Sequence, residues 1–294
     1  MESILLYHCR ALLMDEENTL LDPAYVVVEG ERIAAVSSTR PQGPFAQEID
    51  CGGNVLMPGL VNAHTHIPMT LMRGYAGGCD LHTWLNDWIF PAEAKLDDRA
   101  VRAGADLALA ELIAGGVTTI ADMYMHTPAI AQAVLAAGIS ANLSCGGVYF
   151  GAPGDFSPAT CPDCDHQRQL TEEFHEAGNG QILVDASIHG EYTSNVPLWQ
   201  WMADYAQRKG LGMHVHVSET QSEHEGSLTR WGLTPFRILD RYGVWDTRAI
   251  AAHCVWTTED DWAGMAEKGV ACVHNPVSNL KLGSGVAWIP AMKA

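Results

Sequence analysis

Pro58-Gly59-Leu60-Val61-Asn62-Ala63-His64-Thr65-His66 predicts a buried β-strand that ends in two histidines. Because successive side chains of a strand point to opposite faces, His64 and His66 lie on the same face. Two imidazoles on one face can bind one metal ion, and a catalytic zinc commonly takes about three protein ligands and a water molecule. Further ligands should therefore come from later in the chain. The alternative interpretation is a pair of strand histidines that binds no metal.

The composition is that of a globular protein. The chain has 294 residues, of which 47% are hydrophobic and 18% are charged, so it can form one large domain or two smaller ones. Asp and Glu number 35 against 17 Lys and Arg, which gives a net charge of −18. Such a charge repels phosphate groups, so nucleic acid and anionic membrane surfaces are not expected as partners.

The N-terminus and the cysteines indicate the compartment. Residues Met1 to His8 contain no basic leader before an apolar run, which predicts a cytoplasmic protein without a secretory signal. The eight cysteines have no framework spacing, which indicates free thiols. Only Cys161-Pro162-Asp163-Cys164 resembles a motif, and no second Cys-x-x-Cys follows it. We expect a surface loop there rather than a zinc or redox site.

Residues 1–57 and 58–294 differ in their predicted secondary structure. The first part should form a small β unit with strands over 4–7, 24–29 and 32–37. From residue 58 onward strands and helices alternate, which is typical of a parallel sheet. Strands are expected over 58–66, 117–123, 139–145, 182–189, 211–219, 249–255 and 270–274, and helices over 97–116, 128–137, 168–177, 197–209, 235–242 and 259–268.

Histidines recur at the carboxyl ends of the predicted strands. In a (β/α) barrel the active site lies at that end, so these side chains should converge. Glu219 follows His216 by three residues, and a carboxylate so close to a metal ligand can move protons to and from water. The alternative is a solvent-exposed acid in a loop. The strand-end histidines are His66, His189, His216, His253 and His274.

Four motifs in this order resemble the amidohydrolase superfamily, and more narrowly its 5-methylthioadenosine/S-adenosylhomocysteine deaminases. The resemblance extends from about residue 25 to the end of the chain. It is specific for the superfamily and less specific for the substrate. The motifs are the Pro58 to His66 stretch, His216-Val217-Ser218-Glu219, Ala252-His253-Cys254 and the run from His274-Asn275-Pro276 to Gly283.

The resemblance implies an α/β fold, a (β/α)8 TIM barrel with a small N-terminal β-sandwich unit. It also implies one divalent metal ion, most often zinc with Fe²⁺ as the alternative, bound by His64, His66, His216 and an aspartate from the eighth strand. The fourth predicted strand ends in Ser187-Ile188-His189 and carries no lysine. This fits members with one metal ion rather than those in which a carbamylated lysine bridges two.

The activity implied by the resemblance is the hydrolytic deamination of an adenine nucleoside. Carried onto matching positions, the family roles make Glu219 the proton shuttle and His253 the residue that orients the attacking water. Glu93 matches the acid that binds the ribose hydroxyls, while Trp84 and His189 match residues that line the nucleoside pocket. A small-molecule substrate is expected. Family members often form homodimers, and the sequence itself shows no interface.

Two features depart from the family pattern. Deaminases that accept S-adenosylhomocysteine use arginines after the third strand to bind its carboxylate, whereas residues 140–167 contain no Lys or Arg. An uncharged nucleoside such as adenosine or methylthioadenosine is therefore favoured. The sequence also stops at Ala294, before an eighth strand and its aspartate. We thus expect a truncated barrel over 58–294 and a partial β-sandwich over 1–57.

Other interpretations stay open. A guanine or 8-oxoguanine deaminase, or a triazine hydrolase of the same superfamily, would use a similar site. A non-catalytic scaffold on this fold would have lost metal ligands, as the absent aspartate suggests. The retained side chains that argue against a scaffold are His64, His66, His216, Glu219 and His253.

Overall fold

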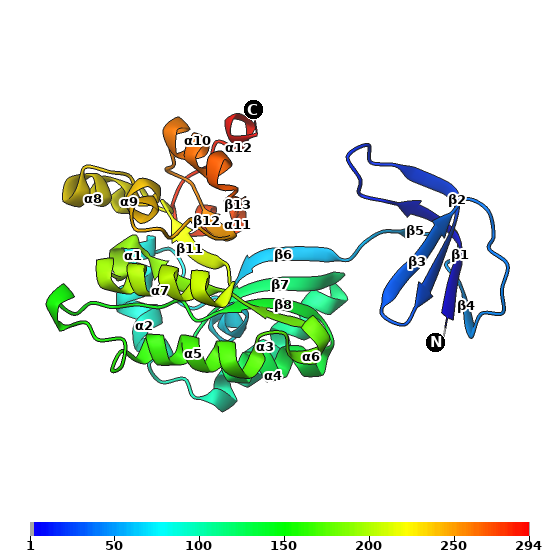
Figure 1. Cartoon of the computed structure of the whole chain (residues 1–294), viewed down its shortest axis with the longest axis horizontal. Coiled ribbons are helices and arrows are strands. Elements are labelled where there is room, and N and C mark those ends of the chain that lie inside the picture. Colours follow the sequence, from blue (N-terminus) through cyan, green and yellow to red (C-terminus); the bar gives the residue numbers. More distant parts are fainter. Residues whose placement is uncertain (1–2, 294) are drawn as a thin grey trace. The chain divides into compact units, whose positions relative to one another are not determined.

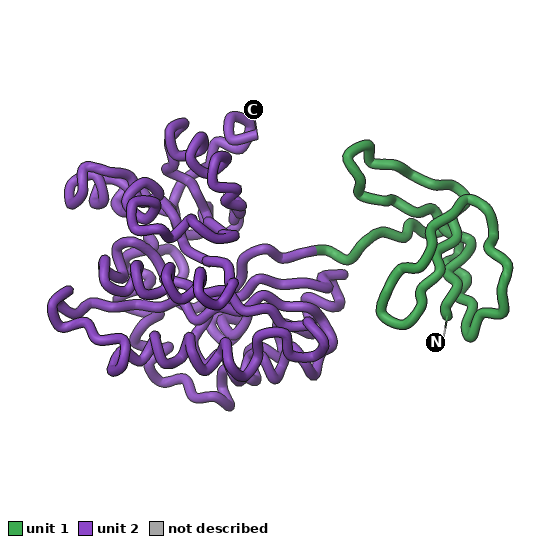
Figure 2. Tube along the Cα trace, viewed as in Figure 1, with its two compact units in different colours: residues 1–60 green, residues 61–294 purple. Residues whose placement is uncertain are grey.

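The chain forms two compact units. A computed structural model describes residues 3–293, and its contacts divide the chain into residues 1–60 and residues 61–294 (Figure 2). The boundary falls at the start of strand β6 (Leu60–Thr65), within the Pro58 to His66 motif.

The smaller unit is a five-stranded sheet in the order β3-β2-β1-β4, with β5 also paired to β1. The strands are β1 (Ser3–Leu12), β2 (Leu20–Glu29), β3 (Arg32–Ser37), β4 (Gln47–Asp50) and β5 (Val55–Leu56). Gly30, at φ +60°, makes the predicted turn between β2 and β3. Strand β4 was not predicted. All four of its side chains are exposed, so they show no pattern of burial, and only main-chain pairing with β1 makes this segment a strand.

Two parallel sheets of four strands each form the larger unit (Figure 1). Their orders, β6-β7-β8-β9 and β10-β11-β12-β13, follow the sequence, and helices connect successive strands except β9 and β10, which only Asp185 separates. The strand predicted over 182–189 is therefore divided between the two sheets. The expected α/β fold is therefore confirmed. The strands after β6 are β7 (Val117–Met123), β8 (Ser140–Ser144), β9 (Ile182–Val184), β10 (Ala186–Gly190), β11 (Met213–Val217), β12 (Ala249–His253) and β13 (Ala271–Val273).

The predicted helices are present, with ends set by recognisable residues. Asp97 accepts a hydrogen bond from the Ala100 N–H at the start of α3, and Gly138 and Gly210 end α4 and α7 in the left-handed conformation. The longer helices are α3 (Asp98–Ala114), α4 (Thr127–Ala137), α5 (Pro162–Phe174), α7 (Val196–Lys209), α8 (Gln221–Trp231), α9 (Pro235–Arg241) and α10 (Glu259–Lys268), and the shorter ones are α6 (Ala177–Gly180), α11 (Pro276–Lys281) and α12 (Ile289–Met292).

The segment between β6 and α3 is helical. It contains a 3-10 helix, Ile67–Met72, followed by the continuous run α1 (Leu81–Thr83), a π-helical turn (Trp84–Ile89) and α2 (Phe90–Glu93). Such π turns widen a helix locally and are frequent at functional sites. Here the turn begins at Trp84 and the run ends at Glu93, two of the predicted substrate-binding residues.

Two local predictions were wrong, and one helix was not predicted. Cys161 and Cys164 are 4% and 0% exposed rather than in a surface loop, because α5 begins at Pro162 and packs them into the core. The strand β6 was expected to be buried, yet Leu60 and Val61 are exposed, since β6 is the last strand of its sheet among the described residues. Helix α8 was not predicted at all.

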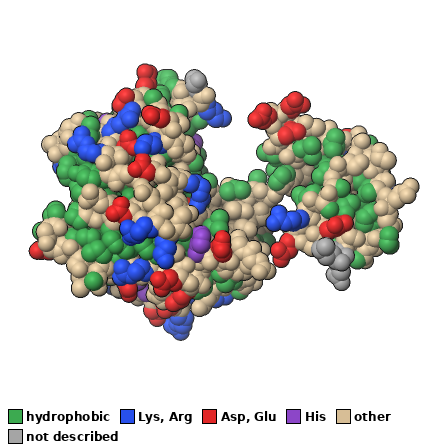
Figure 3. Space-filling view, viewed as in Figure 1, with side chains coloured by type: hydrophobic (Ala, Val, Ile, Leu, Met, Phe, Trp, Pro, Cys, Tyr) green, Lys and Arg blue, Asp and Glu red, His purple; other side chains and the backbone are tan. Residues whose placement is uncertain are grey.

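The cores lie between the sheets and their helices. One cluster joins α7 and α9 to β10, β11 and β12 around Trp199, Phe236 and Trp245, and another joins α3 and α4 to β7 and β8. None of the helices in residues 3–293 combines the length and the apolar character needed to cross a membrane. Lys and Arg side chains are interspersed with Asp and Glu side chains on the face shown in Figure 3.

Candidate metal centre and active site

A cavity of about 680 Å³ opens at the carboxyl ends of the strands in the larger unit. His274 and His126 do not contribute to its lining: Asn275 lines it instead of its neighbour, and His126 Nδ1 lies 2.5 Å from Asp98 Oδ1 on α3. His274 nevertheless lies near the cluster, because its imidazole contributes to lowering the pKa of His253. All eight predicted site residues line the cavity: His64, His66, Trp84, Glu93, His189, His216, Glu219 and His253.

Main-chain carbonyl groups fix the rings of His66 and His216. Nδ1 of His66 lies 2.5 Å from the Met123 carbonyl oxygen, and Nδ1 of His216 lies 2.6 Å from that of His189. A carbonyl oxygen only accepts, so each Nδ1 must carry the proton and donate it. In a neutral imidazole the lone pair then lies on Nε2. The two Nε2 atoms are 3.3 Å apart, and lone pairs that face each other at this distance favour a cation between them.

His253 and His64 complete the cluster. Nδ1 of His253 lies 2.7 Å from Asn279 Oδ1, which leaves Nε2 of His253 as an acceptor. Nε2 of His64 is buried and has no hydrogen-bond partner among residues 3–293. Ring nitrogens of His64, His216 and His253 lie within 4.8 Å of one another. Buried polar atoms are rarely left unpaired, so a metal ion fits these donors better than an empty space does.

Burial keeps these imidazoles neutral. It lowers the pKa of His66 and of His253 to about 4, and it lowers those of His64 and His216 well below 6.5. Neighbouring imidazoles add to the effect because a second positive charge would be repelled. Metal ligands must be deprotonated, so the cluster is ready to bind a cation at neutral pH.

Glu219 lies next to the histidine cluster. Its Oε1 is 3.5 Å from His253 Nδ1 and 3.5 Å from Ser284 Oγ. Burial raises the pKa of Glu219 to about 7, the range in which a carboxyl group can both take up and release a proton. The expectation of a catalytic site is consistent with this geometry, because a shifted carboxyl group in a cleft is typical of active sites.

A second buried acid holds the backbone of Glu219. The N–H groups of Ser218 and Glu219 each donate to the Glu223 carboxylate at 2.7 Å. Burial raises the pKa of Glu223 to about 8, although these two donors act in the opposite direction. Thr220-Gln221-Ser222-Glu223 has the spacing of a helix N-terminal capping sequence, so this signal could have predicted α8.

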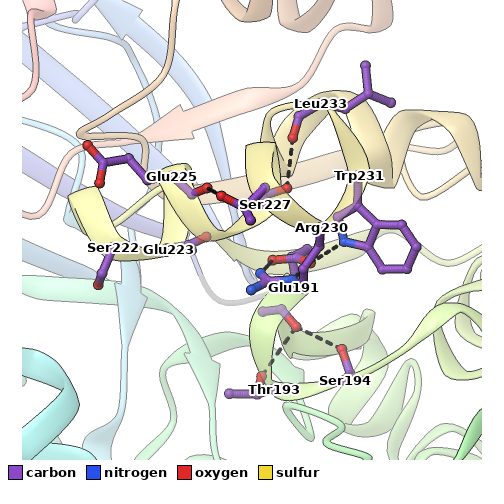
Figure 4. A network of polar contacts seen from close by, with 12 residues as sticks. Glu191, Thr193, Ser194, Ser222, Glu223, Glu225, Ser227, Arg230, Trp231 and Leu233 are labelled. Atoms are coloured by element: carbon purple, nitrogen blue, oxygen red, sulfur yellow. Dashed lines mark hydrogen bonds and ion pairs between the residues drawn. The ribbon is translucent and has the colours of Figure 1, made fainter.

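Helix α8 is also attached at its other end, as Figure 4 shows. The buried Glu191 carboxylate accepts hydrogen bonds from Arg230 Nε at 3.2 Å, Arg230 Nη2 at 2.5 Å and Trp231 Nε1 at 2.6 Å. Glu191 follows β10, two residues after His189. The helix that presents Glu223 to Glu219 is therefore anchored to the segment that carries His189.

Three non-glycine residues at the ends of β11 and β12 have positive φ. The angles are 48° at Ser218, 74° at His253 and 49° at Cys254. Side chains rarely adopt this left-handed conformation outside functional sites and tight turns. The chain therefore turns sharply at the two strand ends that carry Glu219 and His253.

Several residues of the site were not predicted. Tyr124 directly follows β7 and lines the cavity, and its buried hydroxyl lies close enough to the Glu93 carboxyl group to lower the pKa of that group, against the larger effect of burial. Its place after a strand was a usable signal. Asn279 and Glu223 were missed because they act on other residues rather than on the cavity.

The sequence comparison decides the family. The Amidohydrolase family matches residues 55–294. The chain belongs to the amidohydrolase family. The chain is similar to a 5'-deoxyadenosine deaminase of Methanothermobacter thermautotrophicus. The two are 40% identical over a stretch that covers 89% of this chain and 60% of the relative. It is also similar to a 5-methylthioadenosine/S-adenosylhomocysteine deaminase of Dictyoglomus turgidum, with 35% identity over 94% of this chain and 64% of the relative.

A solved structure of the family resembles this amidohydrolase closely. The adenosine deaminase of Xanthomonas campestris, crystallised with bound zinc, superposes with a TM-score of 0.87 at 32% identity, over 99% of this chain and 66% of that one. The predicted TIM-barrel fold and family are thereby confirmed. This amidohydrolase spans about 60% of the length of the curated relatives that it matches.

Proposed function

We propose that this amidohydrolase is a metal-dependent hydrolytic deaminase of an uncharged adenine nucleoside. The observation that carries the proposal is the convergence of imidazole Nε2 atoms in one cavity, beside a buried carboxyl group whose pKa is about 7. The names of its relatives and of the zinc-containing structural neighbour support the same reaction class.

His64, His66 and His216 would hold the metal ion, and the all-imidazole donor set suits zinc, with Fe²⁺ as the alternative. When bound, the ion supplies Lewis acidity that makes water in the site a better nucleophile. The rings are preorganised for this task because hydrogen bonds at Nδ1 already fix those of His66 and His216.

Glu219 would act as the proton carrier. Its carboxylate takes a proton from water and delivers it to a ring nitrogen of the purine, while the water oxygen bonds to the carbon that bears the amino group. Glu219 next takes the remaining proton of the added hydroxyl group and passes it to the amino group, so the carbon–nitrogen bond breaks, ammonia leaves and the oxygen becomes a ring carbonyl. His253 would accept a hydrogen bond from the water at Nε2, since Asn279 fixes its ring, and so keep the nucleophile in line.

The segment after β8 supports an uncharged substrate, while the two cations of the lining, Arg73 and Lys281, come from other segments. From the segment after β8, Cys145, Gly146, Val148 and Phe150 line the cavity together with Asp163, whose carboxylate would repel a substrate carboxylate. Glu93, whose pKa burial raises, is proposed to bind the ribose hydroxyls, and Trp84 and His189 to contact the nucleoside. Adenosine, 5'-deoxyadenosine and methylthioadenosine fit this chemistry.

The test combines elemental analysis with an ammonia-release assay. We expect one equivalent of zinc, or of iron, per chain and turnover of the three uncharged nucleosides in preference to S-adenosylhomocysteine. Preference for S-adenosylhomocysteine would contradict the substrate proposal, and preference for guanine or a triazine would move the protein to another branch of the family. The absence of both bound metal and turnover would place the protein among non-catalytic scaffolds.

Substitutions of Glu93 test whether the site binds the ribose of a nucleoside or only its base. Glu93→Ala should weaken binding of the nucleoside product and leave binding of the free base nearly unchanged, as measured by calorimetry. Glu93→Gln, which keeps the size of the side chain, serves as the matched variant. Equal losses for nucleoside and base would argue against a ribose contact.

A further inference from the structure

We propose that His214 is a positioning residue that fixes the ring and the tautomer of His64. The inference rests on the proposed metal centre, because it explains how His64 is held with a free lone pair. His214 does not line the cavity; it is fully buried in the middle of β11. Its role would therefore be exerted through His64 alone.

A chain of hydrogen bonds joins four strands behind the cavity. Nδ1 of His64, on β6, lies 2.8 Å from Nε2 of His214. Nδ1 of His214 lies 3.3 Å from Oγ of Ser144, the last residue of β8. Oγ of Ser144 lies 3.2 Å from the carbonyl oxygen of Asp122, on β7. All four residues are buried.

The proton positions along this chain have one consistent solution. The carbonyl oxygen of Asp122 can only accept, so the Ser144 hydroxyl donates to it. A lone pair of the Ser144 oxygen then accepts from His214 Nδ1–H. Neutral His214 has its own lone pair on Nε2 and accepts from His64 Nδ1–H. His64 is thus left with a lone pair on Nε2, the atom that has no partner among residues 3–293.

His64 differs in this respect from His66 and His216, and resembles His253, whose ring the Asn279 side chain fixes. His66 and His216 donate to main-chain carbonyl groups, which no substitution removes. His64 depends on a side chain that a single substitution can remove. Groups that orient metal ligands in this way typically change metal affinity or activity by about 10–100-fold when they are lost.

Two substitutions of His214 separate orientation from packing. His214→Phe keeps a flat ring but removes both nitrogens, and His214→Gln keeps an oxygen that can accept from His64. We expect His214→Phe to weaken zinc binding about 10–100-fold, measured by competition with a chromophoric chelator. His214→Gln should bind zinc nearly as well as the wild type does. His175→Phe, outside the cavity, is the control and should leave zinc affinity unchanged.

Nitrogen-15 spectra of the metal-free protein provide a readout that does not depend on the metal. The wild type should show His64 with its proton on Nδ1, and His214→Phe should show a mixture of tautomers. A wild-type His64 with its proton on Nε2 would overturn the inference. So would wild-type zinc affinity in His214→Phe, or equal losses in His214→Phe and His214→Gln. If the wild type binds no zinc, the proposed function fails, while the tautomer of His64 still decides this inference.

Discussion

The site has a histidine side, formed by His64, His66, His216 and His253, and an acid side, formed by Glu219 and the carboxylates of Glu223 and Glu191. The side chains of the two sides are held by opposite kinds of hydrogen-bond partner. On the histidine side, Nδ1–H groups donate to acceptors such as the Met123 and His189 carbonyl groups. On the acid side, the carboxylates of Glu223 and Glu191 accept from N–H groups of the chain and of α8. Acceptors leave each imidazole neutral with a free nitrogen, whereas donors fix where a carboxylate lies. The histidine side therefore depends on two main-chain carbonyl groups and on the side chains of His214 and Asn279, whereas the acid side depends on Glu191 and on side chains of α8.

The largest expected effect comes from breaking the acid side at Glu219. Glu219→Gln removes the proton carrier but keeps the size of the side chain, so deamination should slow by about 10²–10⁴-fold. Ammonia release measures the effect. Metal content should stay at the wild-type level, since the ligands proposed for the ion are all histidines.

Glu225→Gln is the matched control for Glu219→Gln, because Glu225 is an exposed acid of the same helix region. Its rate should stay within about twofold of the wild-type rate, as for most surface substitutions. Equal losses at both positions would mean that the cavity is not where the reaction occurs.

The dependence of stability on pH should separate the two sides. His66 and His253 have a folded-state pKa of about 4 against 6.5 unfolded, so the unfolded chain binds more protons between these values and stability falls as pH drops through them. With about 1.4 kcal/mol per pKa unit, each contributes about 3 kcal/mol by pH 4. Glu219 and Glu223, whose pKa values are raised from 4.5 to about 7 and 8, act oppositely: their stability contribution is complete below pH 4.5 and is lost as pH rises from there through 7 to 8.

Urea unfolding of the chelator-treated protein should show maximal stability near pH 6.5, because the buried imidazoles, which also include His64, His189, His214 and His216, outnumber the buried carboxyl groups in the overlap between pH 4.5 and 6.5. Glu223→Gln should flatten the curve above that maximum and leave stability below pH 4.5 unchanged. Stability that keeps rising down to pH 5 would show that the imidazoles are not held neutral by burial.

The smallest expected effect concerns the far end of α8. Arg230→Met leaves the buried Glu191 carboxylate with only the Trp231 donor, and should lower the free energy of unfolding by about 1–3 kcal/mol, since the Arg230 side chain is itself 45% exposed. Arg208→Met, an exposed arginine at the end of α7, is the control. If the two variants unfold at the same urea concentration, the Glu191 contact does not anchor the helix.

Strand ends and helix ends were predictable because they depend on short-range patterns. The strand β7 and the helices α3 and α4 follow from apolar periodicity and from capping residues such as Asp97 and Gly138. The cavity residues were found from histidines at strand ends. Helix α8 was missed because its composition is polar and only Glu223 and Ser227 are buried on it.

The partners of the site histidines could not be predicted in the same way. The acceptor for His66 lies 57 residues away in the sequence, and His214 lies 150 residues from His64. No local pattern shows which carbonyl group or ring will approach across strands. Sequence therefore indicates which side chains reach the cavity, and the folded arrangement decides which nitrogen each presents.

The left-handed backbone at Ser218 and His253 has a consequence for laboratory evolution. Such conformations cost of order 1–3 kcal/mol each, and glycine adopts them without strain. A library selected only for tolerance to heat should therefore accumulate Ser218→Gly early, because the buried Ser218 hydroxyl also has no hydrogen-bond partner among the described residues. His253 should persist in such a library, since its removal would leave a cavity and an unpaired Asn279, so the backbone beside Glu219 would change before the histidine cluster does.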